Sequence, residues 1–483
     1  MYYNNLTMLA DLYELTMMQG YLLTNTHEKQ VVFDLFYRTN PLGNGYAICA
    51  GLEQAIEYIK NLSFCESDIE YLNSKGIFKE EFLEYLRNFK FKGDVYAIPE
   101  GSVVFPHEPL MRVTASVIEA QLIESALLNI INHQSLIATK AARVVNAAGG
   151  DSVLEFGLRR AQGPDAAIYG ARAAIIGGCN STSNVVAGKM FDVPISGTHA
   201  HSWVMSFPDE LTAFREYAKL YPNMCILLVD TYNTLKIGVP NAITVFNELK
   251  AKGQKLTNYG IRLDSGDLAY LSKKAREMLD EAGFSDAIIS ASSDLDEDLI
   301  SNLKAQGSKI TLWGVGTNLI TSKGWQAFGG VYKLSAEINE NGIIPKIKLS
   351  ENPEKITNPG IKTVFRLYDK ANHKMIADLI SLHDEKIDEN EDLTIFHPIN
   401  TWKKMTLKAG TYCVRDMLVP VFLKGECVYT RPSVKEIADY CISEKETLWE
   451  ENKRLVNPHV VPIDLSLALF ELKRDMIHEI RGE

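Results

Sequence analysis

Short apolar runs that end abruptly in polar or glycine residues recur between residues 150 and 320. ILLVD ends at Asp230, GIRLD at Asp264, AIISASSD at Asp294 and ITLWGVGT at Thr317. Segments with the helical spacing of apolar residues, such as NAITVFNELKAKG and DLAYLSKKAREMLDEAG, fill the intervals. This alternation predicts parallel strands, with polar residues at their carboxyl ends, and favours a barrel. Spacing alone leaves a doubly wound open sheet as the alternative.

The flanking parts of the chain have mixed patterns. Residues 31–38 (VVFDLFYR) are typical of a strand, DVYAIPEGSVVF predicts two strands joined by a turn at 99–101, and 117–143 has the apolar spacing of a long helix. The segment GTYCVRDMLVPVFLKGECVY predicts further strands, and the last 50 residues favour helix.

We therefore expect an α/β fold in which an irregular, TIM-like α/β barrel carries an additional α+β domain. Residues 1–112 would form the N-terminal α+β part and residues 113–340 the barrel with the active site. Residues 341–483 would pack back on both and complete the additional domain.

Composition narrows the class of protein. With 46% hydrophobic and 23% charged residues, the 483-residue chain is an ordinary globular sequence, which excludes disordered, collagen-like and disulfide-scaffold classes. Acidic residues outnumber basic ones 61 to 50, so the formal charge is −11. Such a chain would repel nucleic acid and anionic membranes, and an anionic substrate would need a local basic cluster.

The seven cysteines form no CxxC pair, which predicts reduced thiols and no structural zinc site. No basic residue precedes Lys29 and no run of 18 apolar residues exists, so neither a signal peptide nor a membrane span is expected. These features predict a cytoplasmic protein.

Residues 155–206 hold the densest candidate chemistry, whereas the Walker A, GxGxxG, HExxH and GxSxG patterns are missing from the chain. Phe156 and the neighbouring Arg159 and Arg160 could sandwich and charge-pair a flat anionic ring. Backbone amides of the glycine- and serine-rich stretch at 177–184 could hold anionic oxygens. A histidine of the turn GTHAHS (197–202) could act as a nucleophile beside a carboxylate.

These motifs resemble the type II phosphoribosyltransferases, and among them the nicotinate phosphoribosyltransferase family. The resemblance covers nearly the whole chain and rests on LADLYELTMMQGY (9–21), FDLFYR (33–38), EAQLIESALLNIINHQSLIATKAAR (119–143), EFGLRR (155–160), TSNVVAG (182–188), GTHAHS (197–202), LLVDTYNT (227–234), GIRLDSGDL (261–268) and GVGTNL (314–319). It implies transfer of phosphoribosyl from phosphoribosyl pyrophosphate to nicotinate, with ATP hydrolysis and Mg²⁺, in NAD biosynthesis. It also implies a homodimer with shared active sites.

The resemblance assigns the catalytic residues. His201 aligns with the histidine that ATP phosphorylates, and Asp230 with the carboxylate that orients it. Arg262 and Asp264 resemble a substrate-side arginine and the acid near the ribose hydroxyls. His199 is expected to be a bystander in the same turn. No metal site of the protein's own is predicted.

The resemblance also assigns substrate contacts. Phe156 would stack on the pyridine ring together with Tyr13 of a neighbouring subunit, and Arg159 would lie on the substrate side. Thr182 and Ser183 would donate to the nicotinate carboxylate, since the relative that uses nicotinamide has an aspartate at about Ser183. Residues after two further strands would hold the 5′-phosphate: Ser293, Asp294, Gly314, Gly316 and Thr317.

Several assignments have structural alternatives. Asp294 with Glu297 fits a helix capping box. Arg38, Lys140 and Lys333 are candidate phosphate contacts or members of structural ion pairs. A basic stretch could cover the anionic site through Lys346, Lys348, Lys355 and Lys362. Cys179 and Asn180 depart from the family pattern and receive no role.

Other functions stay open at this point. The nearest are the nicotinamide-specific relative and a quinolinate enzyme. A barrel lyase with Lys333 as a Schiff-base amine would need that amine desolvated, with a lowered pKa. A metabolite sensor would not need to retain a phospho-accepting histidine.

Overall fold

The computed structural model describes residues 5–482 and divides the chain into two compact units. The first contains the chain up to Leu136 and from Ala327 onward, and the second is Ile137–Gln326. The predicted boundaries at 112/113 and 340/341 therefore differ from the observed ones. The reason is strand pairing: β5 (Met111–Ser116) and β12 (Gly330–Asn339) both pair with β1 (Gln30–Tyr37), so they belong with the terminal segments.

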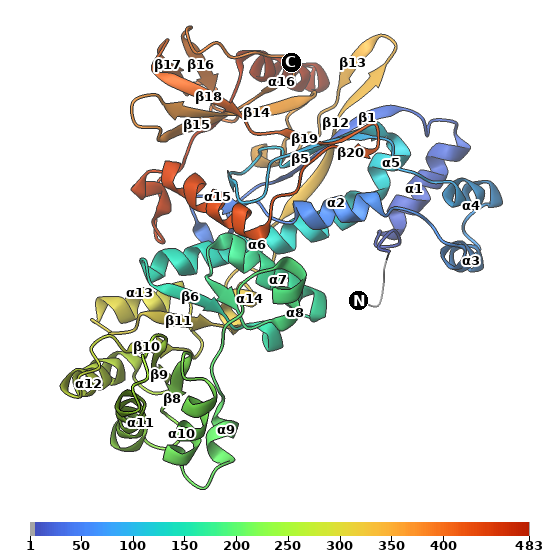
Figure 1. Ribbon diagram of the computed structural model, residues 1–483. Coiled ribbons are helices and arrows are strands. Elements are labelled where there is room, and N and C mark those ends of the chain that lie inside the picture. The colour runs from blue at the N-terminus through green and yellow to red at the C-terminus, as the bar shows by residue number, and fades with distance from the viewer. Residues whose placement is uncertain (1–4, 483) are drawn as a thin grey trace. The chain divides into compact units, whose positions relative to one another are not determined.

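The second unit is built on a six-stranded sheet with the order β7-β6-β11-β10-β9-β8, and every pair within it is parallel (Figure 1). The strands are β6 (Ser152–Glu155), β7 (Ser181–Thr182), β8 (Cys225–Leu228), β9 (Tyr259–Leu263), β10 (Ile288–Ala291) and β11 (Leu312–Val315). The predicted βα alternation is confirmed.

The strand order distinguishes the two predicted architectures. From β8 to β11 each strand lies beside the next one in the chain, and β11 then pairs with β6. This is the cyclic order of a barrel, without the reversal of a doubly wound sheet. However, no ladder joins β7 to β8 within residues 5–482, so the predicted closed barrel is not confirmed.

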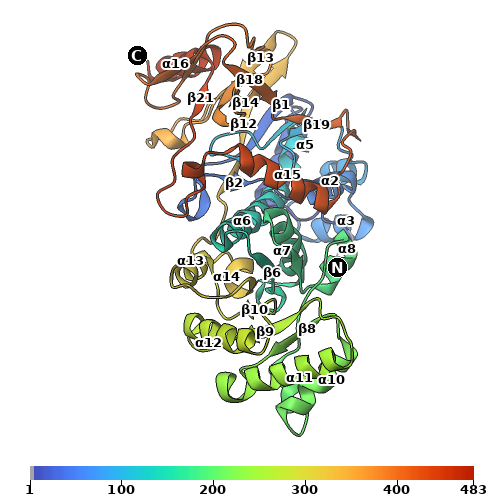
Figure 2. The same cartoon turned by 60° about the vertical axis from the view of Figure 1, so that its left-hand side comes forward.

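Helices follow the strands of this sheet (Figure 2). α10 packs on β8, α11 on β9 and α12 on β9 and β10, as expected when each helix covers the strand beside it. The helices of the unit are α7 (Pro164–Gly177), α8 (Val185–Phe191), α9 (His201–Met205), α10 (Glu210–Leu220), α11 (Val239–Ala251), α12 (Leu268–Glu281), α13 (Glu297–Ala305) and α14 (Thr317–Ile320). The long helix α6 (Glu124–Ala148) contains the division between the units.

The first unit contains an antiparallel sheet with the order β13-β12-β1-β5-β3-β19-β20. Its other strands are β3 (Asp94–Ala97), β13 (Gly342–Pro345), β19 (Val419–Leu423) and β20 (Glu426–Cys427), and its N-terminal helices are α1 (Leu12–Leu23), α2 (Leu52–Lys60), α3 (Glu66–Ser74), α4 (Glu80–Arg87) and α5 (Val117–Leu122). The predicted strand pair at 94–105 separates, because β3 joins this sheet while β4 (Val103–Val104) pairs with β2 (Ala47–Ile48).

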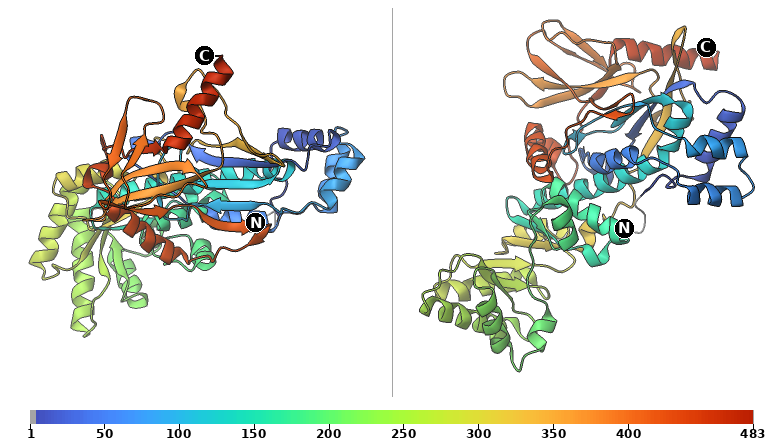
Figure 3. Two further views of the ribbon diagram at one scale, coloured as in Figure 1. Left: turned by 90° about the horizontal axis from the view of Figure 1, so that it is seen from above. Right: turned by 45° about the vertical axis from the view of Figure 1, so that its right-hand side comes forward.

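The same unit contains a second sheet with the order β17-β16-β21-β15-β14-β18. Its strands are β14 (Lys362–Asp369), β15 (Met375–Leu382), β16 (Leu393–Phe396), β17 (Lys404–Leu407), β18 (Tyr412–Asp416) and β21 (Ile463–Leu465). The last part of the chain forms α15 (Val434–Thr447) and α16 (Leu467–Arg481), and α16 packs on β15 and β16 (Figure 3). The terminal helices are confirmed, whereas β21 was not predicted.

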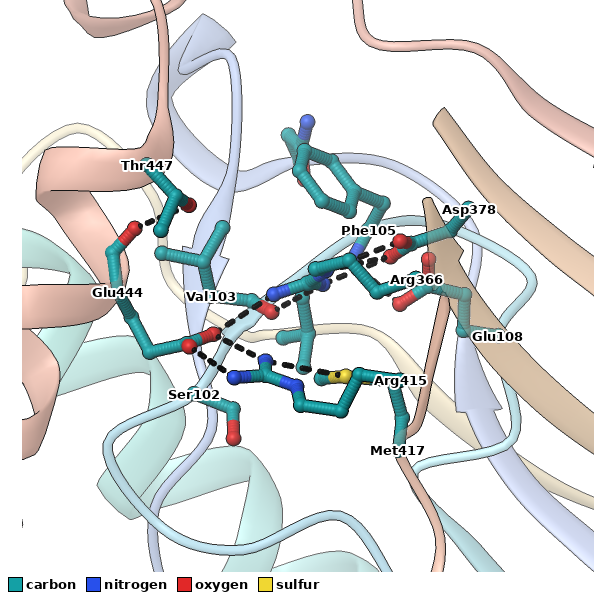
Figure 4. Close-up of polar contacts among 12 residues, drawn as sticks. Ser102, Val103, Phe105, Glu108, Arg366, Asp378, Arg415, Met417, Glu444 and Thr447 are labelled. Carbon is teal, nitrogen blue, oxygen red and sulfur yellow. Dashed lines mark hydrogen bonds and ion pairs between the residues drawn. The ribbon is translucent and has the colours of Figure 1, made fainter. Parts of the chain in front are cut away.

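A buried charge cluster joins these elements around Arg366 of β14 (Figure 4). Its guanidinium donates to both carboxylate oxygens of Asp378 at 2.9 and 2.7 Å and to Glu444 at 2.7 Å. All three side chains are at most 2% exposed, and Arg415 donates to Glu444 from the other side at 2.8 Å. Burial and the nearby charge of Asp378 raise the pKa of Glu108 well above its usual range.

We expect Arg366→Met to lower the free energy of unfolding by about 3–5 kcal/mol, because it leaves the buried carboxylate of Asp378 without its cation and leaves Glu444 paired with Arg415 alone. Urea denaturation measures this loss. Lys408→Met is the matched control, since its pair with Asp392 is exposed and should contribute less than about 1 kcal/mol. Equal stability of the two variants would contradict the interpretation.

Candidate active site

Two predicted catalytic residues, one predicted substrate contact and Ser292, which was not predicted, follow the carboxyl ends of neighbouring parallel strands. Phe156 comes directly after β6, Asp230 two residues after β8, Asp264 directly after β9 and Ser292 directly after β10. Because these strands are parallel, the ends lie at one edge of the sheet. All the predicted residues between 140 and 317 lie in the second unit.

Arg262 and Asp264 form the centre of this edge. Arg262 Nη2 donates to Asp264 Oδ1 at 3.0 Å, Nε donates to Ser292 Oγ at 2.9 Å, and Nη1 donates to Thr198 Oγ1 at 2.7 Å. The Ser292 hydroxyl also donates to Asp264 Oδ1. One arginine thus fixes the loop before α9 and the ends of two strands.

His201 begins α9 and is 41% exposed. Its Nδ1 lies 3.1 Å from Thr231 Oγ1, and its Nε2 lies 3.7 Å from Asp264 Oδ2. The carboxylate beside the imidazole is therefore Asp264, and the predicted orienting role of Asp230 is corrected. Asp230 Oδ2 instead accepts from the Asp264 amide at 2.9 Å and from Ser265 Oγ at 2.6 Å, so Asp230 holds the loop that carries Asp264.

The surroundings of Asp264 favour its ionised form. Partial burial acts to raise its pKa, but the hydrogen bond from Ser292 and the charge and hydrogen bond of Arg262 outweigh it and hold the pKa below its usual value. An anionic Asp264 stabilises positive charge on the adjacent imidazole of His201.

His199 has a different environment from His201. It is 7% exposed, its Nε2 accepts from the Leu228 amide at 3.2 Å, and its ring packs edge-on against Tyr217. Burial lowers its pKa to about 4. His199 thus ties the loop to β8, and its role as a bystander in the reaction stays a prediction.

The aromatic ring of Phe156 packs against a glycine. A Cβ added to Gly314 would lie 2.6 Å from Phe156 Cε2, so a side chain at position 314 would displace the ring. Phe156 is half-buried, and its amide donates to Val315 at 2.8 Å. The space that glycine leaves at this strand end keeps the ring in place.

Buried Glu155 fixes the loop after β7. The Thr182 hydroxyl donates to its carboxylate at 2.6 Å, the Gly157 amide donates to the same group, and the Ser183 amide donates to the Glu155 carbonyl at 2.9 Å. Thr182 is fully buried, whereas Ser183 is half-buried. Thr182 is thus engaged within the protein, and Ser183 is the more accessible of the two.

The turn after β10 has a strained backbone. Ser293 and Asp294 have φ of 98° and 41°, and both side chains are exposed. Such angles are costly for residues with a Cβ and occur mostly at functional turns. The predicted capping box is wrong: Asp296 caps α13, and Asn318 holds the turn by donating to the Asp294 carbonyl at 2.7 Å. Gly316 and Thr317 follow β11 and are half-buried.

Two predicted cationic substrate contacts, Lys140 and Arg159, differ in burial. Lys140 is 3% exposed, and its ammonium lies 2.6 Å from Glu297, which also accepts from Arg143 at 3.0 Å. Its predicted substrate contact is therefore corrected to a buried ion pair between α6 and α13. Arg159 and its neighbour Arg160 are exposed in a short 3-10 helix after Phe156.

The remaining predicted contacts lie in the first unit. Tyr13 on α1 is 45% exposed, and burial together with Glu124 raises its pKa to about 12. Arg38 follows β1 and is half-buried. Lys362 is corrected to a structural residue, because it is 3% exposed and pairs with Asp34 at 2.8 Å. Lys333 donates to the Tyr332 carbonyl, and burial lowers its pKa.

Sequence reasoning missed the hydroxyl side chains that connect the ionic groups, namely Thr198, Thr231 and Ser292. Each stands within one or two residues of a predicted catalytic or substrate-binding residue or in its motif, and this proximity was the available signal. Among residues 5–482, no group of three or more His, Cys, Asp or Glu side chains could hold a metal ion. No helix in this range is long and apolar enough to cross a membrane.

Comparison with known proteins identifies the family. The nicotinate phosphoribosyltransferase (NAPRTase) N-terminal domain matches residues 8–132, the NAPRTase family matches 152–357, and the C-terminal domain matches 361–473. The chain is 49% identical to nicotinate phosphoribosyltransferase of Bacillus subtilis over 479 residues, covering 99% of this chain and 96% of that protein.

More distant relatives agree. Nicotinate phosphoribosyltransferase 2 of Arabidopsis thaliana is 36% identical, over 98% of this chain and 93% of that protein. A crystal structure of human nicotinic acid phosphoribosyltransferase matches with a TM-score of 0.83 at 29% identity, covering 97% of this chain and 100% of that chain. Together with the residues gathered at the strand ends, these matches show that the chain belongs to the nicotinate phosphoribosyltransferase family.

Proposed function

We propose that the protein transfers phosphoribosyl from phosphoribosyl pyrophosphate to nicotinate, giving nicotinate mononucleotide and pyrophosphate, and that ATP drives this reaction through phosphorylation of His201. The observation that carries the proposal is the accessible imidazole of His201, with Thr231 at Nδ1 and the Asp264 carboxylate at Nε2. Family membership supports the overall transfer.

In the proposed first half of the cycle, the Nδ1–H of His201 donates a hydrogen bond to the Thr231 hydroxyl, and this tautomer leaves the Nε2 lone pair free. Nε2 attacks the terminal phosphorus of ATP, the bond to the bridging oxygen breaks, and ADP leaves. Asp264 compensates the positive charge on the ring, and Arg262 is 3.0 Å from Asp264 and keeps that carboxylate in position.

Mg²⁺ would enter with the phosphates of the substrates and neutralise their charge. The carboxylates at the strand ends fit such an ion, because Asp230 Oδ1 is buried and has no hydrogen-bond partner among the described residues. Mg²⁺ is usually bound by one or two carboxylates together with substrate phosphates and water. The carboxylates of Asp230 and Asp264 would therefore be enough to hold it.

In the proposed transfer step, the Phe156 ring stacks on nicotinate and the Ser183 hydroxyl donates to its carboxylate. The exposed turn at Ser293 and Asp294 and the glycines before α14 hold the 5′-phosphate. Pyrophosphate leaves as the glycosidic carbon becomes cationic, and the pyridine nitrogen forms the new bond. The chain supplies position and charge compensation rather than a nucleophile toward the sugar.

We also propose that the enzyme is a cytoplasmic homodimer in which Tyr13 completes the site of the neighbouring subunit. The Tyr13 side chain is 45% exposed, so it is available to a second chain. The competing lyase interpretation has the lowered pKa of Lys333 in its favour. However, the Lys333 amine already donates to a backbone carbonyl, and family membership supports the transferase.

With phosphoribosyl pyrophosphate and Mg²⁺, we expect nicotinate mononucleotide from nicotinate and little product from nicotinamide, with ATP stimulating turnover. His201→Ala should abolish the stimulation, because it removes the phosphate acceptor. Chromatographic measurement of mononucleotide and ADP tests this. Lys408→Met is the control, because its exposed pair with Asp392 lies in the other unit. Full ATP stimulation in His201→Ala would refute the coupling.

Ser183→Asp should raise KM for nicotinate by about tenfold or more, because it places a like charge beside the substrate carboxylate. Ser183→Ala should have a smaller effect, since it only removes one hydrogen bond. Steady-state kinetics separates the two variants. Equal KM values for them would mean that residue 183 does not face the carboxylate.

Subunit mixing tests the shared site. In the presence of ATP, Tyr13→Ala and His201→Ala should each lack the ATP-stimulated activity when assayed alone. Re-associated mixtures should recover up to about a quarter of wild-type activity, because a heterodimer contains one intact site. If mixing restores nothing although mass spectrometry detects heterodimers, Tyr13 acts within its own subunit or only in folding.

A further inference from the structure

A cavity of about 620 Å³ lies within the unit formed by the terminal segments of the chain. Its walls combine apolar side chains, including Phe105, Ile380 and Ile399, with the charged side chains of Arg38 and Lys473. A volume of this size and an apolar lining with a few polar groups are typical of small-molecule sites. None of the catalytic residues at the strand ends of the other unit belongs to it.

Lys473 is the unusual member of this lining. It lies on α16 and is 7% exposed, and its ammonium donates to Asn358 Oδ1 at 2.9 Å. Within residues 5–482 it forms no ion pair, and the cation that affects it most, Lys362, is already paired with Asp34. Burial lowers its pKa to about 8. A buried ammonium without an anion is costly, so its retention calls for a compensating charge.

Arg38 and His107 also line this cavity, and the charges of Lys473 and Arg38 both act on His107. Arg38 Nε is buried without a hydrogen-bond partner in the described chain. Burial and the charges of Lys473 and Arg38 lower the pKa of His107 to about 4, so the three groups act on one another. His107 also has φ of 72°, which is a strained conformation for a residue with a Cβ.

Two carboxylates line the same cavity, but they do not neutralise these cations. Asp464 is buried, and the cationic groups that act on it are His397 and Lys403. Glu354 is exposed to solvent. The charges of Arg38 and Lys473 therefore stay uncompensated within the cavity.

We propose that this cavity binds a phosphate group, free or as part of a small ester such as a nucleotide, at Lys473, Arg38 and His107. Asn358 positions the Lys473 ammonium, and the apolar wall around Ile399 takes the organic part of an ester. None of the proposed catalytic residues His201, Asp230, Arg262 and Asp264 lines this cavity, so a ligand bound here would act through other residues.

Calorimetric titration of the full chain with inorganic phosphate and with adenosine 5′-monophosphate tests the proposal. The titrations are made in an Arg262→Met background, which weakens phosphate binding at the catalytic edge. Lys473→Met should weaken binding of both probes by about tenfold or more, because it removes a charged hydrogen-bond donor. Lys473→Arg, which keeps the charge, should bind within a few-fold of the parent.

A second variant identifies the source of the phosphate. Ile399 is 41% exposed, so Ile399→Trp should fold normally while narrowing the cavity. Weaker nucleotide binding with unchanged phosphate binding supports an ester ligand, and Lys473-dependent binding of phosphate alone supports the free ion. Binding that is equal in Lys473→Met and its parent, or no binding of either probe at millimolar concentration, overturns the proposal. Turnover of the wild-type chain is measured in a separate assay. The binding results can therefore be interpreted even if the proposed transferase activity is not found.

Discussion

The ion pair between Arg262 and Asp264 is the interaction on which the candidate site depends. The two residues are separated by one position at the end of β9, and the arginine also contacts Thr198 before α9 and Ser292 after β10. Asp264 in turn lies beside His201, and its amide donates to Asp230 after β8. A single strand end therefore sets the positions of the groups on both sides of it. This network also explains why Asp264 stays ionised despite its partial burial.

Much of this arrangement could be predicted from sequence, because it follows from local patterns. The apolar runs that end at Asp230 and Asp264 are strands, and their parallel pairing brings the polar ends together. The partner of each side chain could not be predicted in the same way. Asp230 and Asp264 both end a strand, and only the three-dimensional path of the loops shows that Asp264 is the neighbour of His201.

The partners of the buried cations and the pairing of distant strands also could not be predicted from the sequence. Lys140 and Glu297 are far apart in sequence, so no local pattern reports that they pair. In the segment from Tyr412 to Leu423, the apolar pattern predicted strands correctly, yet β18 and β19 belong to different sheets. Pairing over long sequence separation is decided by packing, which the alternation of residues along one strand does not encode.

Two buried basic residues of this net acidic chain differ in whether a carboxylate compensates their charge. Arg366 is fully buried and compensated by carboxylates, whereas Lys473 is nearly as buried and has none. The first arrangement is that of a structural cluster. The second motivates the proposed phosphate site, because the hydrogen bond from Lys473 to Asn358 supplies no compensating charge.

Identification of the phosphorylated residue tests the central claim most directly. After incubation with ATP and Mg²⁺ and digestion under alkaline conditions, mass spectrometry can locate an acid-labile phosphate in the peptide that contains both His199 and His201. The account predicts phosphate on His201, which is exposed beside Asp264, and none on buried His199. Phosphate on His199, or an enzyme that couples ATP hydrolysis to turnover without any phosphohistidine, would contradict it.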